Sequence, residues 1–224
     1  MDRNDPAWKG QSEYTPLLLR LYNPLVLGPI ARFVWRVPAR HLVDHYRRHI
    51  RPGHLDVGPG TGVFILRSGL AAGSAVTILD PNPNVLTHCR PRLAQFDLTA
   101  VQADVLKPLP LERRFSSAAL NLVIHCLPGP AERKAKAVEH IAAVLEPDGV
   151  LFGASVLGTT GRHSPQARAF LKAFNWNGGF DNLDDSESML VDILEASFEE
   201  VTVGTIGSAA LFSAQGPRRS GVAT

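Results

Sequence analysis

The sequence has few of the features that mark secreted or membrane proteins. Its 224 residues include only two cysteines, Cys89 and Cys126, which excludes a disulfide framework. The N-terminal stretch MDRNDPAWKG has no basic segment followed by an apolar one, so it does not look like a secretory signal. Apolar runs are broken by Pro, Gly or charged residues before they reach membrane-spanning length. We therefore expect a cytoplasmic protein that does not enter a membrane.

An excess of charge of one sign is also missing. The chain has 23 basic and 21 acidic side chains and a formal net charge of +2, which gives no broad electrostatic footprint for nucleic acid. A metal-ligand set is not visible either. His41, His45 and His49 recur every four residues, but their basic surroundings favour a solvated helix face over a metal site. We predict no metal and no nucleic-acid partner, and the oligomeric state stays open.

Apolar residues and strand-like runs are what the sequence does have. Hydrophobic residues make up 45% of the chain, enough for one core, so a single main domain is expected. Prolines cut residues 1–50 into a lead-in and a helical cap, and 51–215 form the main domain. Within it, 158–185 are expected to cover the substrate. Residues 216–224 are expected to form a disordered tail.

Strands and helices alternate from residue 54 onward. The runs HLDVG, AVTILD, LTAVQAD, SSAALNLVIHCL and VLFGASVL predict strands, and the stretches between them predict helices. This alternation predicts an α/β fold with a parallel sheet covered on both faces. The last two runs, in EEVTVGTIGSAALFSAQ, leave no room for a crossover helix, so they are expected to pair as an antiparallel hairpin.

The turn after the first strand has three glycines, Gly58, Gly60 and Gly62, in the stretch HLDVGPGTG. Glycine lets the backbone turn sharply and approach a ligand closely. The dinucleotide fingerprint requires a glycine where this chain has Val63, and the Lys-Ser/Thr phosphate loop is absent. Asp56 precedes the turn, where its charge would repel a pyrophosphate. These features indicate a ligand that carries cationic groups rather than phosphates.

A second carboxylate follows the second strand. Asp80 comes after AVTIL, at roughly the offset of ~20 residues at which an acidic residue accepts hydrogen bonds from ribose hydroxyls. A nucleoside with positive groups in place of phosphates describes S-adenosylmethionine. A nicotinamide-dependent oxidoreductase is the rival interpretation, which Val63 disfavours.

Here the chain resembles a known family. HLDVGPGTG, ILDPNPNVL, QADVL, ALNLVIHCLPG and VLEPDGVLFGASVL occur in the order and spacing of class I S-adenosylmethionine-dependent methyltransferases. The resemblance implies a Rossmann-like, doubly wound, seven-stranded, mostly parallel sheet whose C-terminal hairpin adds an antiparallel strand, with an N-terminal helical cap. It also implies S-adenosylmethionine as the cofactor. The cofactor-binding residues it implies are Asp56, Gly58, Pro59, Gly60, Thr61, Gly62, Asp80, Pro81, Asn82, Asp104, Val105 and Asn121.

Individual roles within this set also follow from the resemblance. It assigns the glycines and Asp56 to the methionine end of the cofactor, and Asp80 to the ribose. It places Asp104 and Val105 beside the adenine, and Asn121 beside the cofactor after the fourth strand. Leu120, where many relatives carry a small or polar residue, is left off the site.

The acceptor is expected to be a small or medium organic molecule, of the kind that secondary metabolism modifies. His125 is the candidate for a catalytic role, because an imidazole can remove a proton near neutral pH, although a positioning role is favoured. A protein that binds the cofactor but catalyses another reaction, such as a cyclisation, remains an alternative. So do transfers to O, N, C or S. The residues expected in the acceptor pocket are Tyr14, Tyr22, Trp35, His125, Trp176 and Phe180.

Overall fold

A computed structural model of the chain describes residues 26–160 and 162–218. Seven strands form one sheet in the order β3-β2-β1-β4-β5-β7-β6. Only β7 runs antiparallel to its neighbours, β5 and β6. The predicted fold class, a doubly wound and mostly parallel sheet with an antiparallel C-terminal hairpin, is therefore confirmed. The strands are β1 (His54–Val57), β2 (Ala75–Leu79), β3 (Asp97–Val101), β4 (Phe115–Asn121), β5 (Leu145–Val156), β6 (Phe198–Ile206) and β7 (Ala209–Pro217).

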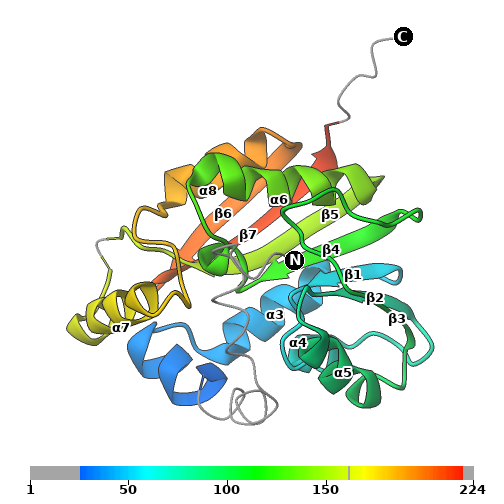
Figure 1. Cartoon of the computed structure of the whole chain (residues 1–224), viewed down its shortest axis with the longest axis horizontal. Coiled ribbons are helices and arrows are strands. Elements are labelled where there is room, and N and C mark those ends of the chain that lie inside the picture. The colour runs from blue at the N-terminus through cyan, green and yellow to red at the C-terminus, as the bar shows by residue number, and fades with distance from the viewer. Residues whose placement is uncertain (1–25, 161, 219–224) are drawn as a thin grey trace.

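Helices cover both faces of the sheet (Figure 1). Helices α6 and α8 lie together on one face, and α3, α4 and α5 lie on the other. Helix α7 packs against the π-helical segment η1. The helical elements are η1 (Val26–Val34), α3 (Ala39–His49), α4 (Val63–Leu66), α5 (Pro83–Arg92), the 3-10 turn η2 (Ile124–Cys126), α6 (Ala131–Val144), α7 (Pro165–Trp176) and α8 (Glu187–Glu195).

Helix starts follow from side-chain caps that the sequence provides. Asn82 accepts a hydrogen bond from the Asn84 backbone N–H, and Pro83 occupies the first turn of α5. Ser164 caps α7 in the same way. Helix α4 is short, and it is followed by a turn in which the Ser68 hydroxyl accepts from the Leu70 N–H.

Helix α3 differs from the expectation of a solvated basic helix. Leu42, His45 and Tyr46 are buried against the sheet, and only the opposite side carries exposed arginines. The His45 Nε2 atom lies 2.9 Å from the Phe212 carbonyl oxygen and donates to it, since a carbonyl can only accept. Burial lowers the pKa of His45. The expectation that the three histidines share a solvated face was wrong for His45, because Leu42 and Tyr46 give α3 a buried side that includes it.

Two further properties concern the described residues as a whole. Within 26–160 and 162–218, no group of three or more His, Cys, Asp or Glu side chains is placed to hold a metal ion. None of the helices in these same ranges is both long and apolar enough to cross a membrane.

Candidate functional site

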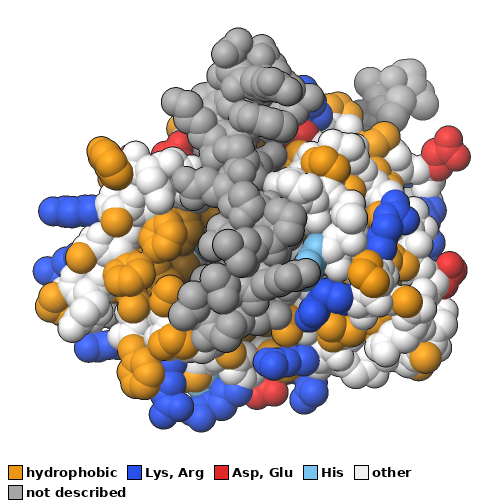
Figure 2. Space-filling view, turned by 60° about the horizontal axis from the view of Figure 1, so that its bottom comes forward, with side chains coloured by type: hydrophobic (Ala, Val, Ile, Leu, Met, Phe, Trp, Pro, Cys, Tyr) orange, Lys and Arg blue, Asp and Glu red, His pale blue; other side chains and the backbone are white. Residues whose placement is uncertain are grey.

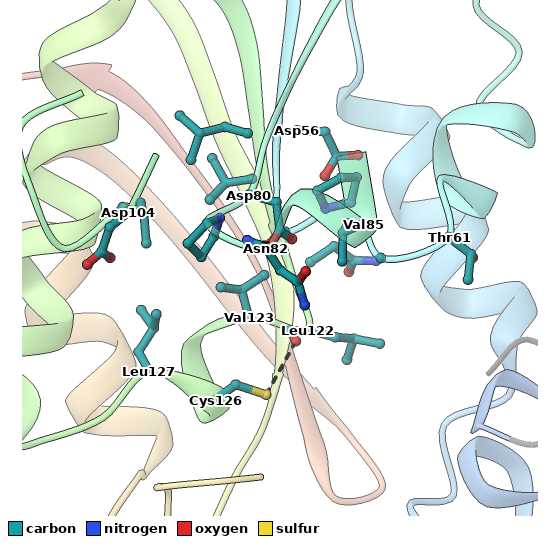
Figure 3. Close-up of a pocket in the computed structure, with 18 of the residues that line it drawn as sticks. Asp56, Thr61, Asp80, Asn82, Val85, Asp104, Leu122, Val123, Cys126 and Leu127 are labelled. Carbon is teal, nitrogen blue, oxygen red and sulfur yellow. Dashed lines mark hydrogen bonds between the residues drawn. The ribbon is translucent and has the colours of Figure 1, made fainter. Parts of the chain in front are cut away.

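A cavity opens at the carboxyl ends of β1, β2 and β4 (Figure 3). Strand β1 pairs with β2 on one side and with β4 on the other, so the chain reverses its winding direction there. Ligands of doubly wound sheets bind at this switch point. The predicted cofactor-binding residues that line the cavity are Asp56, Gly58, Pro59, Gly60, Thr61, Asp80, Pro81, Asn82, Asp104, Val105 and Asn121.

The glycine turn brings backbone close to its neighbours. Gly58 has a φ of +68°, and a Cβ atom there would lie 2.7 Å from Cγ2 of Val123. Gly62 also has a positive φ, +71°, but it does not line the cavity. It caps α4 instead, and its α-carbon faces Leu93. The lack of a side chain at Gly58 thus allows the backbone to lie close to Val123 at the cavity wall, whereas Gly62 provides the positive φ at which α4 starts.

Asp56 is a fully enclosed carboxylate at the wall of the cavity. Its Oδ2 atom accepts a hydrogen bond of 2.5 Å from the Tyr46 hydroxyl of α3. Burial raises the pKa of Asp56 to about 7, the hydrogen bond from Tyr46 opposes that rise, and the nearby Asp80 adds to it. Near neutral pH, a positively charged ligand would therefore stabilise the ionised form of this carboxyl group.

Asp80 follows β2 and shares the cavity with Asp56 (Figure 3). Its Oδ1 atom accepts from the Asn82 backbone N–H at 2.8 Å. Burial raises the pKa of Asp80 to about 7, although the hydrogen bond from Asn82 opposes the rise. Two buried carboxyl groups that face one cavity favour a ligand with cationic groups and hydrogen-bond donors.

Asn121 ends β4, Leu122 follows it, and both line the cavity. The Asn121 Nδ2 atom is buried and has no hydrogen-bond partner among the described residues, so it offers a donor to a ligand. Leu122 has a φ of +62°, which is costly for a residue with a branched side chain. Strain of this kind concentrates at binding and catalytic sites.

Asp104 and Val105 line a third part of the cavity, beyond β3. The Asp104 Oδ1 atom accepts from the Leu106 N–H at 3.0 Å, which fixes the turn that leads away from the strand. Val105 is buried. Leu79, Leu106 and Leu127 line the same cavity, so it has an apolar portion as well as a polar one. An apolar portion of this kind suits a flat, weakly polar group such as a nucleobase.

His125 lies in η2 and is not among the residues that line the cavity, although Cys126 beside it is. Only 4% of His125 is exposed. Its Nδ1 atom accepts from the Val156 backbone N–H at 3.2 Å, which places the proton of the neutral ring on Nε2. Burial lowers the pKa of His125 to about 3, and the charge of Lys134 adds to this. The ring is therefore neutral and has no free lone pair.

The predicted acceptor residues form an aromatic cluster next to the cavity rather than its wall. Phe180 lies against His125 at 4.4 Å between ring centroids and against Trp35 at 6.1 Å. None of these three residues lines the cavity. Trp176, at the end of α7, is 89% exposed and lies outside it too. Tyr14 and Tyr22 fall outside the described residues.

Several lining residues were not predicted. These include Leu122 and Val123, between β4 and η2, and Cys126 in η2, which belong to the segment ALNLVIHCLPG that pointed to the family. Its apolar residues could have been added to the site on that basis. Tyr46, which holds Asp56, lies in a helix that comes before the motifs, and no sequence pattern pointed to it.

These residues fit S-adenosylmethionine. Its amino group and its ribose hydroxyls are donors that suit the two buried carboxyl groups, Asp56 and Asp80. Its carboxylate is an acceptor that suits an unpaired amide such as that of Asn121. Two acceptors and one donor in the cavity wall therefore match complementary groups of one molecule.

Comparison with known proteins gives an independent view of the same chain. A family model described as "Methyltransferase domain" matches residues 55–153. A "Physcion biosynthesis cluster O-methyltransferase" of Aspergillus chevalieri is 32% identical over 97% of this chain and 100% of its own. A "Demethylluteothin O-methyltransferase" of Streptomyces thioluteus is 33% identical over 92% and 90% of the two chains. The "N-methyltransferase vrtF" of Penicillium aethiopicum is 34% identical over 80% and 75%.

Solved structures agree on the fold. The "N-methyltransferase NodS from Bradyrhizobium japonicum WM9", solved with S-adenosyl-L-homocysteine, superposes with a TM-score of 0.59 at 15% identity. The match covers 80% of this chain and 88% of that one. The matches to the first two relatives span nearly the whole of this chain, so they include most of the part before the glycine turn.

Proposed function

The chain belongs to the class I S-adenosylmethionine-dependent methyltransferases that act on small molecules, and we propose that its acceptor atom is the oxygen of an acidic hydroxyl group. S-adenosylmethionine supplies an electrophilic methyl group on a sulfonium. The observation that carries the proposal is the absence of a spare base among the described residues that line the cavity. The O-methyltransferases among the relatives support the choice of oxygen.

We assign the polar wall of the cavity to the cofactor. Asp56 pairs with the amino group of S-adenosylmethionine, Asp80 accepts from the ribose hydroxyls, and Asn121 donates to an acceptor on the same molecule. The burial of all three side chains supports these roles, because charge-assisted hydrogen bonds are strongest away from water.

With these assignments, no side chain that lines the cavity is available to deprotonate the acceptor, so the acceptor must ionise by itself. The titratable groups that line the cavity are Asp56, Asp80, Asp104 and Cys126. Burial raises the pKa of Cys126 to about 12, so its thiol stays protonated. Asp56 and Asp80 are assigned to the cofactor above, and we place Asp104 beside its adenine, so none of these groups is left to remove a proton. A phenol or a conjugated enol, which ionises readily, suits such a site better than an alcohol.

His125 acts by position in this proposal. Its ring supports Phe180 from one side, while its Nδ1 atom is held by the Val156 N–H. Catalysis then depends on holding the acceptor in line with the methyl group in a dry site, which lowers barriers by up to about 7–11 kcal/mol in well-oriented systems.

The experiment compares acceptor classes with radiolabelled S-adenosylmethionine. A panel of phenols and conjugated enols is assayed beside aliphatic alcohols and amines of similar size. We expect transfer to the acidic hydroxyls, with a rate that rises with pH through the pKa of each acceptor rather than through a pKa shared by all. Faster transfer to alcohols or amines would contradict the proposal, and so would one enzyme pKa common to every acceptor.

Two further expectations go with this function. We propose a small-molecule acceptor as the partner and a cytoplasmic location. Cys89 and Cys126 are both free thiols, which supports a reducing compartment. Equal protection of the fold by a nicotinamide dinucleotide and by S-adenosylhomocysteine would instead favour the oxidoreductase alternative.

A further inference from the structure

A chain of buried hydrogen bonds runs from the sheet to Asp56 through residues that do not line the cavity. The Tyr46 hydroxyl lies 2.5 Å from Asp56 Oδ2 and 2.9 Å from His54 Nε2. The other ring nitrogen of His54, Nδ1, lies 2.9 Å from the Ser117 hydroxyl. Tyr46, His54 and Ser117 are all almost completely buried. The chain therefore connects helix α3, strand β1 and strand β4.

The direction of these hydrogen bonds follows from the number of protons. Tyr46 has one hydroxyl proton, which it donates to the carboxylate of Asp56. Its oxygen must then accept from His54, so the neutral His54 ring carries its proton on Nε2. Its Nδ1 atom then accepts from the Ser117 hydroxyl, which lies closer to that nitrogen, at 2.9 Å, than to the Arg51 carbonyl oxygen, at 3.2 Å. Burial lowers the pKa of His54 to about 3, which keeps the ring neutral. Each donor thus points toward Asp56.

We propose that Tyr46, oriented by His54, is a positioning residue that keeps Asp56 ionised and turned toward the amino group of the cofactor. The inference rests on the proposed function, because it concerns the carboxylate assigned there to S-adenosylmethionine. Tyr46 does not touch the cavity, so it acts only through Asp56.

The surroundings of Asp56 show why one hydroxyl matters. From α3 it faces Tyr46, from β1 it faces the neutral His54, from the end of β2 it faces Asp80, and from α5 it faces the thiol of Cys89. Burial and the charge of Asp80 both favour the protonated carboxyl group. Burial also keeps Cys89 a neutral thiol, because it raises its pKa to about 12. The hydrogen bond from the Tyr46 hydroxyl opposes these effects and favours the carboxylate.

Removal of the hydroxyl is therefore expected to raise the pKa of Asp56 and to weaken the cofactor complex in a pH-dependent way. A hydrogen bond to a charged group corresponds to about a tenfold to hundredfold change in an equilibrium constant. In Tyr46→Phe we expect S-adenosylhomocysteine to bind about tenfold or more weakly at pH 7. The affinity should approach that of the wild type as the pH rises, because Asp56 then ionises even without the hydroxyl.

Two measurements on the full chain test this. Calorimetry gives the Kd of S-adenosylhomocysteine at pH values from 6 to 8.5 for the wild type and for Tyr46→Phe. Carbon-13 NMR of the aspartate carboxyl groups in ligand-free protein gives the titration midpoint of Asp56, which Asp56→Asn assigns. His54→Leu keeps both the phenol and the carboxyl group but removes the donor to the phenol oxygen. It should move the midpoint upward by a smaller amount.

Phe152→Leu is the matched control, because Phe152 packs on the rings of both Tyr46 and His54, at 5.1 and 5.8 Å between centroids, and does not line the cavity. It should leave unchanged both the titration midpoint of Asp56 and the pH dependence of the Kd for S-adenosylhomocysteine. An unshifted Asp56 midpoint in folded Tyr46→Phe or His54→Leu would overturn the inference, as would an equal shift in Phe152→Leu. Failure of the wild type to bind S-adenosylhomocysteine would instead refute the proposed function. The ligand-free titration would still decide the role of Tyr46.

Discussion

The cofactor region and the aromatic region of this molecule are built in different ways. The cofactor region consists of Asp56 to Thr61, Asp80 to Asn82, Asp104 with Val105, and Asn121, which lie at the ends of β1, β2 and β4 and in the loop after β3. The aromatic region consists of Trp35, His125, Phe170, Phe174 and Phe180, which come from the residue after η1, from η2, from α7 and from the loop after α7. The carboxyl groups of the cofactor region line a cavity, whereas the rings of the aromatic region pack against one another.

The difference shows how each region is held in place. The sheet fixes the strand ends, and hydrogen bonds from Tyr46, Asn82 and Leu106 hold the carboxyl groups of the cofactor region. The aromatic region depends on contacts between distant segments, above all those of Lys134 in α6. Its ammonium group binds both carboxylate oxygens of Asp185, at 2.6 and 2.7 Å, and the Asp181 carbonyl oxygen, at 2.6 Å. These contacts fasten the loop that carries Phe180. Figure 2 shows apolar side chains gathered on the molecular face where α7 and η1 lie.

Lys134→Met is expected to have the largest effect of the changes that separate the two regions. Lys134 is only 1% exposed, and the variant leaves Asp185 buried without its partner. Breaking such a pair costs about 3–5 kcal/mol of the free energy of unfolding. Urea unfolding followed by fluorescence measures the loss, and Lys134→Met with Asp185→Leu should restore much of it.

The control for this variant is Lys136→Met, which breaks the exposed pair with Glu139 and should cost less than about 1 kcal/mol. Equal losses in the two variants would mean that the buried pair does not hold the aromatic region. The regions would then not differ in the way described.

Asp80→Ala tests the cofactor region with the next largest effect. We expect the binding of S-adenosylhomocysteine to weaken by about 2–3 kcal/mol, because a charged acceptor for the ribose hydroxyls is lost. Stability should not fall, since Asp80 is buried and its carboxylate is poorly solvated. Asp97→Ala, at the exposed start of β3, is the control that should leave the Kd unchanged. A wild-type Kd in Asp80→Ala would move the ribose partner elsewhere.

The same contrast explains how far the sequence could predict the structure. The sheet, its antiparallel hairpin and the switch-point cavity could be predicted, because strand periodicity and the glycine turn are local patterns. Asp56 and Asp80 could be assigned to one cavity because parallel strands end at one edge. The order of strands places both at the carboxyl edge of the sheet, where they line one cavity.

Trp35, His125 and Phe180 were expected in one acceptor pocket, but the contacts between their rings and the contact of Tyr46 with Asp56 could not be predicted. Phe180 meets His125 and Trp35 only after α7 and its loop have folded back, and no spacing in the sequence encodes that return. His45 and Tyr46 were similarly hidden, because the charges of α3 dominated its pattern and its buried side is narrow. Long-range packing decided these positions, whereas local propensity decided the strand ends.

His125→Asn is expected to have a moderate effect that distinguishes support from proton transfer. The ring is neutral and its Nδ1 atom is engaged, so we expect turnover to fall less than a hundredfold and the acceptor KM to rise. A general base would contribute about 10²–10⁴-fold. The pH dependence of single-turnover rates in the wild type and the variant decides between them. Loss of a wild-type ionisation in the variant, with a rate loss above a hundredfold, would make His125 the base.

Trp176→Ala is expected to have the smallest effect, because its side chain is 89% exposed at the end of α7. A surface substitution of this kind changes the free energy of unfolding by about 0.5 kcal/mol or less. We also expect the acceptor KM to stay the same, in contrast to Phe180→Leu, which removes a ring from the aromatic cluster. Thermal unfolding and acceptor kinetics of the two variants provide the comparison. A higher acceptor KM in Trp176→Ala, without lost stability, would show that the segment 158–185 closes over the bound acceptor. Trp176 would then belong to the acceptor pocket, as the sequence predicted.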